Sequence, residues 1–509
     1  MNKYITSIAI LLTVGFCNIS CIEETPSYFE FEDYSFSELD ENGGLMNTFL
    51  LVDIEEIALE APQTGRAQEL DDIKLLMSSM TKDETKAVEY WTSNPIIRWN
   101  EIALELAAKY NLIPGPNEDG TYTLPNPANP QGPPAFPFAH PPYTSRALAY
   151  LSVAQFDGLV AAWHYKYKFK LNSPYQEDSG IIPAYSKNNL PSFPSDGAVV
   201  AKVSKDILSA MFPLEKDFLE GLFQEHLRSM LQAGINFKSD LDAGELIGSE
   251  ISKIALQRAS TDGMSKAQTP KPVSDSIKNA AFERFGWAWE NMESPKRPVG
   301  LTPLFGKVKM WNVSNVEEVR PGPPPAPGSD QFNKDAEELK RFANNLTVEQ
   351  RKIANWWQDG LGTYTPPGHW NKFAKEAIVK NKLNPLRSAK VFAYMNTAIV
   401  DAGISCWDAK YYYHYPRPIQ TIPGFKTILG TPNFPAYTSG HSTFSAAGAI
   451  VLSYFFPEDQ SMFNKYAEEA AMSRVYGGIH YRFDAEVGIE QGRNVGSYAV
   501  EKAKNDRVK

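Results

Sequence analysis

The sequence is poor in cysteine, in excess positive charge and in long hydrophobic runs. Its 509 residues include three cysteines, 50 basic residues and 60 acidic ones, and the formal net charge is −10. This balance argues against a nucleic-acid-binding protein. Beyond the N-terminus the best candidate for a membrane span, residues 446–456, is too short to cross a bilayer. Hydrophobic residues still make up 43% of the chain, which is enough for a large core.

The N-terminus has the features of an export signal. A lysine precedes the apolar run at residues 8–16, and the small residue Ser20 stands directly before Cys21. This order resembles the cleavage site of bacterial lipoproteins, so we expect residues 1–20 to be a signal peptide and Cys21 to be lipidated. An ordinary signal peptide is the alternative, and Asn18 departs from the aliphatic residue that is usual in the lipoprotein pattern.

These features predict an exported bacterial lipoprotein, held at the outer membrane or cell surface through its lipid alone. Cys17 would leave with the signal peptide and Cys21 would carry the lipid, so Cys406 has no partner and no intrachain disulfide is expected. Residues 21–45 are acidic and lack helical periodicity, and we interpret them as a tether.

The rest of the chain predicts an all-α protein. Apolar residues recur mostly at helical spacing, as in residues 146–169, whereas alternating strand patterns are scarce. Two proline-rich stretches, 125–142 and 321–327, interrupt the helices, and the second marks the expected connection between two halves. We therefore expect an N-terminal helical bundle over residues 46–320 and a second bundle over residues 321–509.

An internal repeat supports this division. Many residues match at a constant offset of 244, including Ala149 and Ala393, Asp157 and Asp401, Trp163 and Trp407, Lys166 and Lys410, and Asp240 and Asp484. Upstream, pairs such as Trp99 and Trp370 follow an offset of 271. The repeat predicts two related, pseudo-symmetric helical bundles in tandem, at roughly residues 85–255 and 350–503.

The two copies differ at residues that can perform chemistry. At four such positions the second copy has Arg417, His441, Arg474 and His480, and the first has Ser173, Gly197, Met230 and Asn236. Cations and imidazoles that occur in one copy are better site candidates than residues shared by both. We therefore expect the active site in the second bundle, and we expect the first bundle to lack the site residues.

The candidate residues of the second bundle suit an oxyanion. They form three groups: Lys410 and Arg417; Ser439, Gly440 and His441; and Arg474, His480 and Asp484. Cations and a small dipeptide before a helical run can bind the oxygens of a tetrahedral or trigonal anion. His480 and Asp484 are four residues apart on one helix face, where the carboxylate can orient the imidazole. His441 is then free to act as an acid or base.

In this order, the three groups resemble the tripartite motif of the type 2 phosphatidic acid phosphatase and vanadium-dependent haloperoxidase superfamily. This chain has Thr438 where the second motif usually has proline. The resemblance implies paired four-helix bundles. It also implies a phosphate or vanadate bound by Lys410, Arg417, Ser439, Gly440 and Arg474.

The superfamily implies two possible sets of roles. In a phosphatase, His480 would attack phosphorus to form a phosphohistidine, His441 would protonate the leaving group and Asp484 would orient His480; no cofactor would be needed. In a haloperoxidase, His480 would be the ligand of vanadium, and His441 would take a proton from peroxide. The motif alone does not choose between them.

Neighbouring residues favour the haloperoxidase. The sequence His-Tyr-Arg-Phe-Asp-Ala at residues 480–485 is similar to the His-Trp-Arg-Phe-Asp-Ala of chloroperoxidase-type enzymes. Trp407 and Phe434 resemble positions that shape a halide pocket in those enzymes. Both have an alternative interpretation as packing aromatics, since the counterpart of Trp407, Trp163, lies in the copy without a site.

Three hypotheses follow. The first is an oxidoreductase that uses vanadate and hydrogen peroxide to oxidise halide, and the second is a phosphatase acting on phosphate esters. The third is a binding protein without activity, against which the complete set of site residues argues. Four other histidines lack metal-ligand spacing and are predicted to be structural: His140, His164, His226 and His369.

Overall fold

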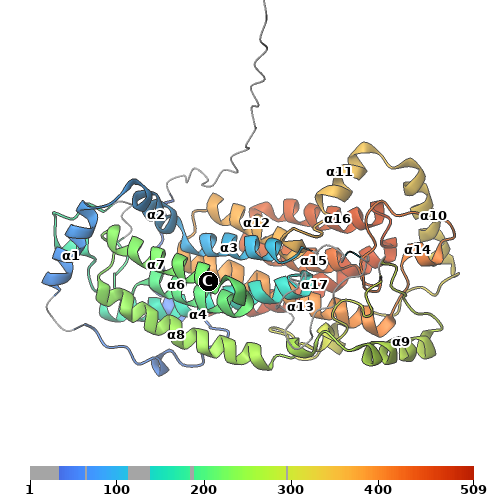
Figure 1. Cartoon of the computed structure of the whole chain (residues 1–509), viewed down its shortest axis with the longest axis horizontal. Helices are drawn as coiled ribbons and strands as arrows, with labels where there is room; N and C mark the ends of the chain where they lie inside the picture. The colour runs from blue at the N-terminus through green and yellow to red at the C-terminus, as the bar shows by residue number, and fades with distance from the viewer. Residues whose placement is uncertain are drawn as a thin grey trace, which may run out of the picture. The chain divides into compact units, whose positions relative to one another are not determined.

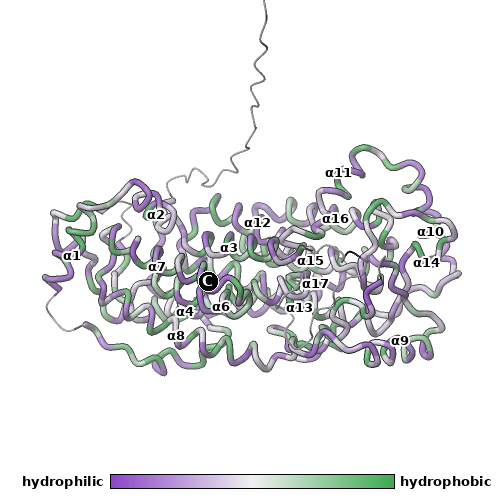
Figure 2. The backbone as a smooth tube through the Cα atoms, in the orientation of Figure 1, coloured by the Kyte–Doolittle hydropathy of each residue, from purple (hydrophilic) through white to green (hydrophobic). Residues whose placement is uncertain are grey.

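The structure is a computed structural model that describes residues 34–62, 66–112, 118, 138–183, 189–293 and 296–508. Within these ranges the chain forms helices and no strands, so the predicted all-α class is confirmed (Figure 1). Hydrophobic and hydrophilic segments alternate along α8 (Lys238–Thr261) and α9 (Lys271–Phe285), as Figure 2 shows. This alternation is typical of helices that pack one face on a core.

The helix boundaries reproduce the internal repeat. Five helices of the first repeat return 244 residues later with the same start, and four of them with the same end. The pairs are α4 (Pro141–Phe169) with α13 (Pro385–Tyr413), α5 (Pro174–Glu177) with α14 (Pro418–Thr421), α6 (Asp196–Met211) with α15 (Gly440–Phe455), α7 (Lys216–Gln232) with α16 (Gln460–Tyr476), and α8 with α17 (Arg482–Lys504). Upstream, α3 (Pro95–Lys109) corresponds to α12 (Thr365–Lys380) at the offset of 271 to within one residue. The helix before each of them is α2 (Lys82–Ser93) in the first repeat and α11 (Val348–Trp356) in the second. The predicted tandem arrangement of two related bundles is therefore confirmed.

The remaining elements precede or connect these pairs. They are α1 (Ala67–Ser78), α10 (Asp330–Asn345) and the short 3-10 helices η1 (Gly43–Leu45), η2 (Ile54–Glu56), η3 (Pro213–Glu215), η4 (Met264–Lys266), η5 (Phe305–Lys307), η6 (Val316–Val319) and η7 (Pro457–Asp459). Figure 1 shows the blue-to-green helices of the first repeat beside the orange-to-red helices of the second.

The repeats meet through pairs of counterpart residues. α4 packs along α13, and Asn396 Nδ2 donates at 2.8 Å to Ser152 Oγ, its counterpart at the offset of 244. Asn100 Nδ2 likewise donates at 2.9 Å to Oδ1 of its own counterpart, Asn371. Contacts between counterparts are a property of two-fold related interfaces. The two repeats are therefore related by an approximate internal two-fold axis.

The two long central helices end at matching points. α4 and α13 each begin with proline in the first turn, where no N–H donor is needed. Each ends before a residue in the left-handed conformation, Lys170 or His414. The chain therefore leaves α13 shortly after Lys410 and turns into the segment that carries Arg417.

Residues 34–45, the described end of the expected tether, pack on the helices. Asp40 forms an ion pair with Arg387 in the first turn of α13, and the Trp163 indole donates to the Leu39 carbonyl at 2.9 Å. This end of the tether is thus held rather than free, because a carboxylate that is largely removed from solvent requires a cationic partner. Residues 1–20 and Cys21 lie outside the described residues.

One hydrophobic core extends through both repeats. It includes the fully buried indoles of Trp99 and Trp163 in the first repeat and of Trp370 and Trp407 in the second. The expected division after residue 320 therefore separates two repeats that share a core. No helix among the described residues has both the length and the hydropathy required to cross a bilayer.

Candidate active site

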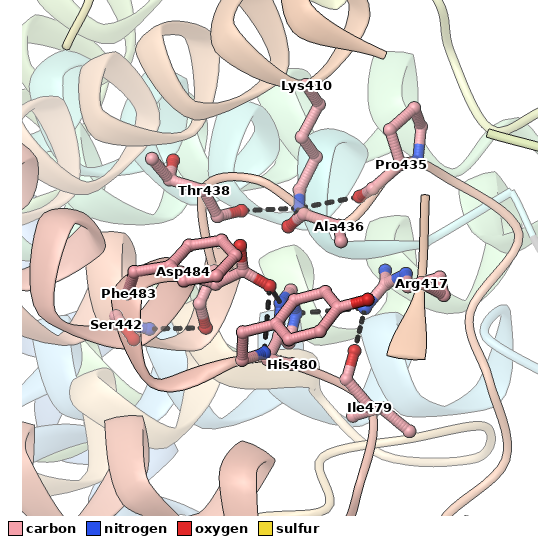
Figure 3. A network of polar contacts seen from close by, with 12 residues as sticks. Lys410, Arg417, Pro435, Ala436, Thr438, Ser442, Ile479, His480, Phe483 and Asp484 are labelled. Atoms are coloured by element: carbon pink, nitrogen blue, oxygen red, sulfur yellow. Dashed lines mark hydrogen bonds and ion pairs between the residues drawn. The ribbon is translucent and has the colours of Figure 1, made fainter. Parts of the chain in front are cut away.

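The second repeat brings the predicted site residues together from separate elements. They are Lys410 near the end of α13, Arg417 in the following turn, Ser439, Gly440 and His441 at the start of α15, Arg474 at the end of α16, His480 in the next loop and Asp484 in the first turn of α17. Figure 3 shows Arg417, His480 and Asp484 in one chain of polar contacts, with Lys410 reaching the loop above them.

His480 is fixed in one orientation by Asp484. Its Nδ1 lies 2.9 Å from Asp484 Oδ2, which also accepts the Tyr481 N–H at 3.1 Å. Because the carboxylate is an acceptor, Nδ1 carries the proton and Nε2 keeps its lone pair. Burial, followed by the nearby cations, holds the pKa of His480 well below its usual value. His480 therefore presents a neutral Nε2, as a nucleophile or a metal ligand requires.

Arg417 faces the same nitrogen with an unused donor. Its Nη1 donates to His480 Nε2 at 3.0 Å and to the Ile479 carbonyl at 2.7 Å, and its Nε donates to the Phe434 carbonyl at 3.0 Å. Its Nη2 is buried and has no hydrogen-bond partner in the described part of the chain. Burial lowers the pKa of Arg417 to about 10, so the guanidinium stays charged at neutral pH. A bound oxyanion would satisfy the free Nη2 donors.

Lys410 contacts the protein rather than the open space of the site. Its ammonium donates to the carbonyls of Pro435, at 2.9 Å, of Ala436, at 2.8 Å, and of Thr438. Burial lowers the pKa of Lys410 from its usual value. The structure thus places the predicted anion ligand Lys410 as a clamp on the loop before α15, where its charge still adds to the positive field of the site.

The first repeat has the same clamp. The Lys166 ammonium donates to the carbonyls of Pro191 and Ser192, at the positions equivalent to Pro435 and Ala436. Because this copy lacks the histidines of the site, the lysine clamp belongs to the shared scaffold.

The start of α15 provides backbone donors. Ser439 caps the helix: its Oγ accepts the Ser442 N–H at 3.4 Å, and its own N–H donates to the Asp484 carbonyl at 3.0 Å. This bond ties the start of α15 to α17 beside His480. A helix N-terminus attracts anions through its free N–H groups and its dipole. Ser439 and Gly440 therefore lie at the N-terminus of α15, where an anion could be bound.

Arg474 and His441 complete the polar side of the site. Arg474 donates to Ser473 Oγ at 2.9 Å and to the Ala354 carbonyl at 3.0 Å, and burial lowers its pKa to about 10. His441 is kept neutral because burial, and then Arg474, lower its pKa well below its usual value. Its Nε2 is buried without a hydrogen-bond partner among the residues that the structure describes. This nitrogen can take or deliver a proton.

Part of the site opens onto a cavity of about 320 Å³, within the size range of small-molecule sites, whereas Lys410, Arg417, Ser439 and Asp484 do not line it. Six predicted residues line it: Trp407, Phe434, Gly440, His441, Arg474 and His480. Trp407 and Phe434 pack on each other with ring centroids 5.1 Å apart and form an apolar wall. The Trp407 indole also donates to the Leu301 carbonyl, as that of Trp163 does to Leu39, so Trp407 combines a packing role with its place on the wall.

Much of the cavity wall comes from residues that no sequence motif marks. Asn111 and His140 come from the first repeat, Glu293 and Arg297 from the connection, and Asp359 from the loop after α11. His140 was predicted to be structural; it caps α4 and also lines the cavity. No spacing pattern marks these residues, because tertiary packing alone brings them to the site.

The donor set fits a tetrahedral or trigonal oxyanion. Arg417 Nη2 and His441 Nε2 are buried polar atoms without hydrogen bonds in the described ranges, and the start of α15 adds backbone N–H groups. Buried polar groups are rarely left without partners, so such atoms point to a ligand. Vanadate and phosphate both suit this arrangement.

Comparisons with known proteins agree with the motif. Residues 390–503 match the PAP2 superfamily, which confirms for this segment the resemblance predicted from the three groups. The vanadium chloroperoxidase of Curvularia inaequalis is 24% identical over 201 residues, which are 31% of this chain and 33% of that protein. The match therefore spans about a third of the relative's length.

A solved structure shares the fold. It is that of a bacterial vanadium-dependent iodoperoxidase, which aligns with 71% of this chain and 91% of its own length, at 24% identity and a TM-score of 0.58. The all-helical architecture predicted from the repeat is thus the architecture of a known haloperoxidase structure.

Proposed function

We propose that the protein is a vanadium-dependent haloperoxidase that oxidises halide with hydrogen peroxide. The observation that carries the proposal is the orientation of His480: its Nδ1 is held by Asp484, while its Nε2 faces a guanidinium with an unused buried donor. The apolar wall of Trp407 and Phe434 beside this nitrogen supports a halide site.

When bound, vanadate would supply a Lewis-acid centre that activates peroxide. His480 Nε2 would hold the metal, while Arg417, Arg474 and the start of α15 would neutralise the oxygens. Ser439 and Gly440 would contribute to anion binding through the N-terminus of α15. The charge of Lys410 would add to the positive electrostatic potential at the site.

Proton movement falls to His441. The net reaction of halide, peroxide and one proton gives hypohalous acid and water, so a group beside the reacting oxygens must exchange protons. His441 Nε2 is neutral and without a hydrogen-bond partner among the described residues, and it would accept the peroxide proton and return it to the departing oxygen. The walls of Trp407 and Phe434 would limit water around the halide.

The same cage supports a phosphatase as the second candidate. His480 Nε2 would attack phosphorus, His441 would protonate the leaving oxygen, and no vanadate would be needed. The match of residues 390–503 to the PAP2 superfamily is consistent with this reaction.

One preparation tests both candidates. The purified protein is assayed with and without orthovanadate for peroxide-dependent bromination of a phenol dye and for p-nitrophenyl phosphate hydrolysis. We expect halogenation only with vanadate, abolished in His480→Ala and retained in Asn236→Ala, the matched change in the first repeat. Phosphate release that vanadate inhibits, without halogenation, would assign the phosphatase; silence in both assays would refute both.

We further propose that the chain is exported and lipidated at Cys21. The support is the N-terminal sequence, with its apolar run and Ser20-Cys21. Detergent partitioning and mass spectrometry of the full chain expressed in bacteria test the proposal. A lipid mass that is lost in Cys21→Ser supports it, whereas an unmodified, water-soluble product indicates an ordinary signal peptide.

A further inference from the structure

Thr438, which stands where the second motif usually has proline, is hydrogen-bonded to a buried glutamine of α17. Its hydroxyl donates to Gln491 Oε1 at 2.6 Å and lies 3.6 Å from the weaker acceptor Cys406 Sγ. Gln491 Nε2 in turn donates to Ser405 Oγ at 2.6 Å. Thr438 and Ser405 are fully buried, and Gln491 is 4% exposed. These side chains form a polar network between the loop before α15, α17 and α13.

The direction of these hydrogen bonds is fixed at one end. The Ser405 hydroxyl lies 3.2 Å from the Val319 carbonyl, which can only accept, so Ser405 donates there and its oxygen accepts from the Gln491 amide. The amide oxygen of Gln491 is then left for Thr438, which must donate. Buried hydrogen bonds that run in one consistent direction strengthen each other. Removal of one hydroxyl would leave a buried polar atom without its partner.

The backbone of Thr438 connects this network to the site. Its carbonyl accepts from the Lys410 ammonium, as Figure 3 shows. The next residue, Ser439, caps α15 and donates its N–H to the Asp484 carbonyl at 3.0 Å. Gln491 lies two turns beyond Asp484 in the same helix. The residue directly before the helix N-terminus of the candidate anion site is therefore held by its side chain as well as by its backbone.

The first repeat has apolar residues at all three positions of the network. They are Pro194, Ile247 and Ala161, in place of Thr438, Gln491 and Ser405, and all three are buried. The loop still makes the same backbone contact, since the Ser195 N–H donates to the Asp240 carbonyl at 2.9 Å. The two copies thus hold one loop by different means. A proline ring restricts the backbone in the first copy, and hydrogen bonds from the side chain of Thr438 restrain it in the second.

We propose that Thr438, Gln491 and Ser405 form a positioning network for the anion site, which holds the loop before α15 so that the helix N-terminus and the Lys410 charge stay directed at a bound oxyanion. The three residues do not line the cavity, so they act through the loop and not by contact with the anion. The inference rests on the proposed function for the presence of the anion. It applies equally to vanadate and to phosphate.

Calorimetry with inorganic phosphate is the first test. Thr438→Val removes the hydroxyl with little change of shape and should weaken phosphate binding by about 10-fold or more, as the loss of an outer partner usually does. Gln491→Ile removes the acceptor of that hydroxyl and should weaken binding as well. Thr438→Ser keeps the hydroxyl and should bind phosphate almost as the wild-type protein does.

A matched pair of variants separates the network from buried hydrogen bonds in general. In the first repeat Gln155 Nε2 donates at 2.9 Å to Ser204 Oγ, which is also fully buried. Ser204→Ala and Ser405→Ala each remove a serine hydroxyl that accepts from a glutamine, so both should lower the free energy of unfolding. Only Ser405→Ala should also weaken phosphate binding. A merely structural role of Ser405 predicts no such difference.

The residues of the first repeat provide a rescue. The triple variant Thr438→Pro, Gln491→Ile and Ser405→Ala has the apolar set by which the first repeat holds the loop. It should bind phosphate more tightly than Thr438→Val, because proline again restricts the backbone and no polar atom of the network is left without a partner. Affinity no better than that of Thr438→Val would contradict the comparison between the repeats.

The outcomes that overturn the proposal differ from those that overturn the proposed function. Phosphate affinity that is unchanged in Thr438→Val, or lowered equally by Ser204→Ala and Ser405→Ala, would refute the network while leaving the anion site in place. If the wild-type protein binds neither inorganic phosphate nor orthovanadate, the proposed function fails and the inference fails with it. Circular dichroism shows which variants are folded, and Ser405→Ala, the smallest change, tests the network if Thr438→Val is not.

Discussion

Substitution of Gly492 by alanine should destabilise the protein, although alanine is the better helix former. Three glycines of α17, Gly488, Gly492 and Gly496, face α15. A Cβ at Gly492 would lie 2.3 Å from the Thr443 carbonyl oxygen, and one at Gly488 would lie 3.0 Å from the Ser439 carbonyl oxygen. α15 and α17 therefore pack backbone to backbone, directly behind the start of α15.

The magnitude follows from two opposing terms. Alanine in a helix interior gains about 1 kcal/mol over glycine. An ordinary carbon–oxygen contact is about 3.3 Å, so Gly492→Ala must separate the two helices locally by about 1 Å. Overpacking costs about 1–3 kcal/mol, and the upper end applies because the clash is with backbone. The net effect is a loss of about 1–2 kcal/mol.

A matched control isolates the clash. Gly221 lies in α7, and a Cβ there would meet nothing within 4 Å, so Gly221→Ala should stabilise the protein by about 0.5–1 kcal/mol. Unfolding of both variants is followed by circular dichroism against denaturant, and inorganic phosphate affinity by calorimetry. Gly492→Ala should also weaken phosphate binding, because it displaces the start of α15. Equal or greater stability of Gly492→Ala than of the wild-type protein would refute the reasoning.

Three further outcomes are expected. Burial lowers the pKa of His226 to about 3, so between about pH 6.5 and pH 3 only the unfolded state takes a proton at this residue. The folded state should therefore lose up to about 1.4 kcal/mol of stability for each pH unit below about 6.5. Unfolding measured at stepped pH should show a smaller loss in His226→Gln. Asn396→Ala should lower the free energy of unfolding in denaturant by about 1–3 kcal/mol, and Ser152→Ala should lower it less, because Asn396 donates to two acceptors. Equal losses in the two variants would contradict this. Arg417→Lys should weaken phosphate binding about ten-fold or more, measured by calorimetry, because an ammonium cannot replace the paired N–H donors of a planar guanidinium. Unchanged affinity would show that the positive charge alone is sufficient.

The helical class and the two related bundles could be predicted because the internal repeat is visible in the amino-acid sequence. The offset of 244 that joins Trp163 to Trp407 also joins the starts of α4 and α13. Helical periodicity and proline at helix starts are local patterns, so they can be recognised without knowledge of tertiary contacts. The packed end of the expected tether was not predictable in this way, since the acidic residue Asp40 is held by Arg387, hundreds of residues away.

The candidate site could be predicted in part. His480 and Asp484 were expected on one helix face. The structure joins them, but His480 lies in the loop before α17, and Asp484 reaches it from the first turn of that helix. The use of Lys410 as a loop clamp could not be predicted, since its partners are backbone carbonyls, which leave no trace in sequence. His369 was expected to be structural, and its contact with Asp359 depends on the packing of α12 against the loop after α11.

The counterpart contacts of Asn100 with Asn371 and of Ser152 with Asn396 give the chain the character of a tethered dimer. In a dimer of identical subunits, any change made for one active site is imposed on both. Here the two repeats are encoded by different parts of one chain, so each can change without the other. The first repeat contributes none of the candidate anion-binding residues, yet it lines the cavity through residues such as His140. Changes in the first repeat can therefore alter the cavity wall while the candidate site residues of the second repeat stay unchanged.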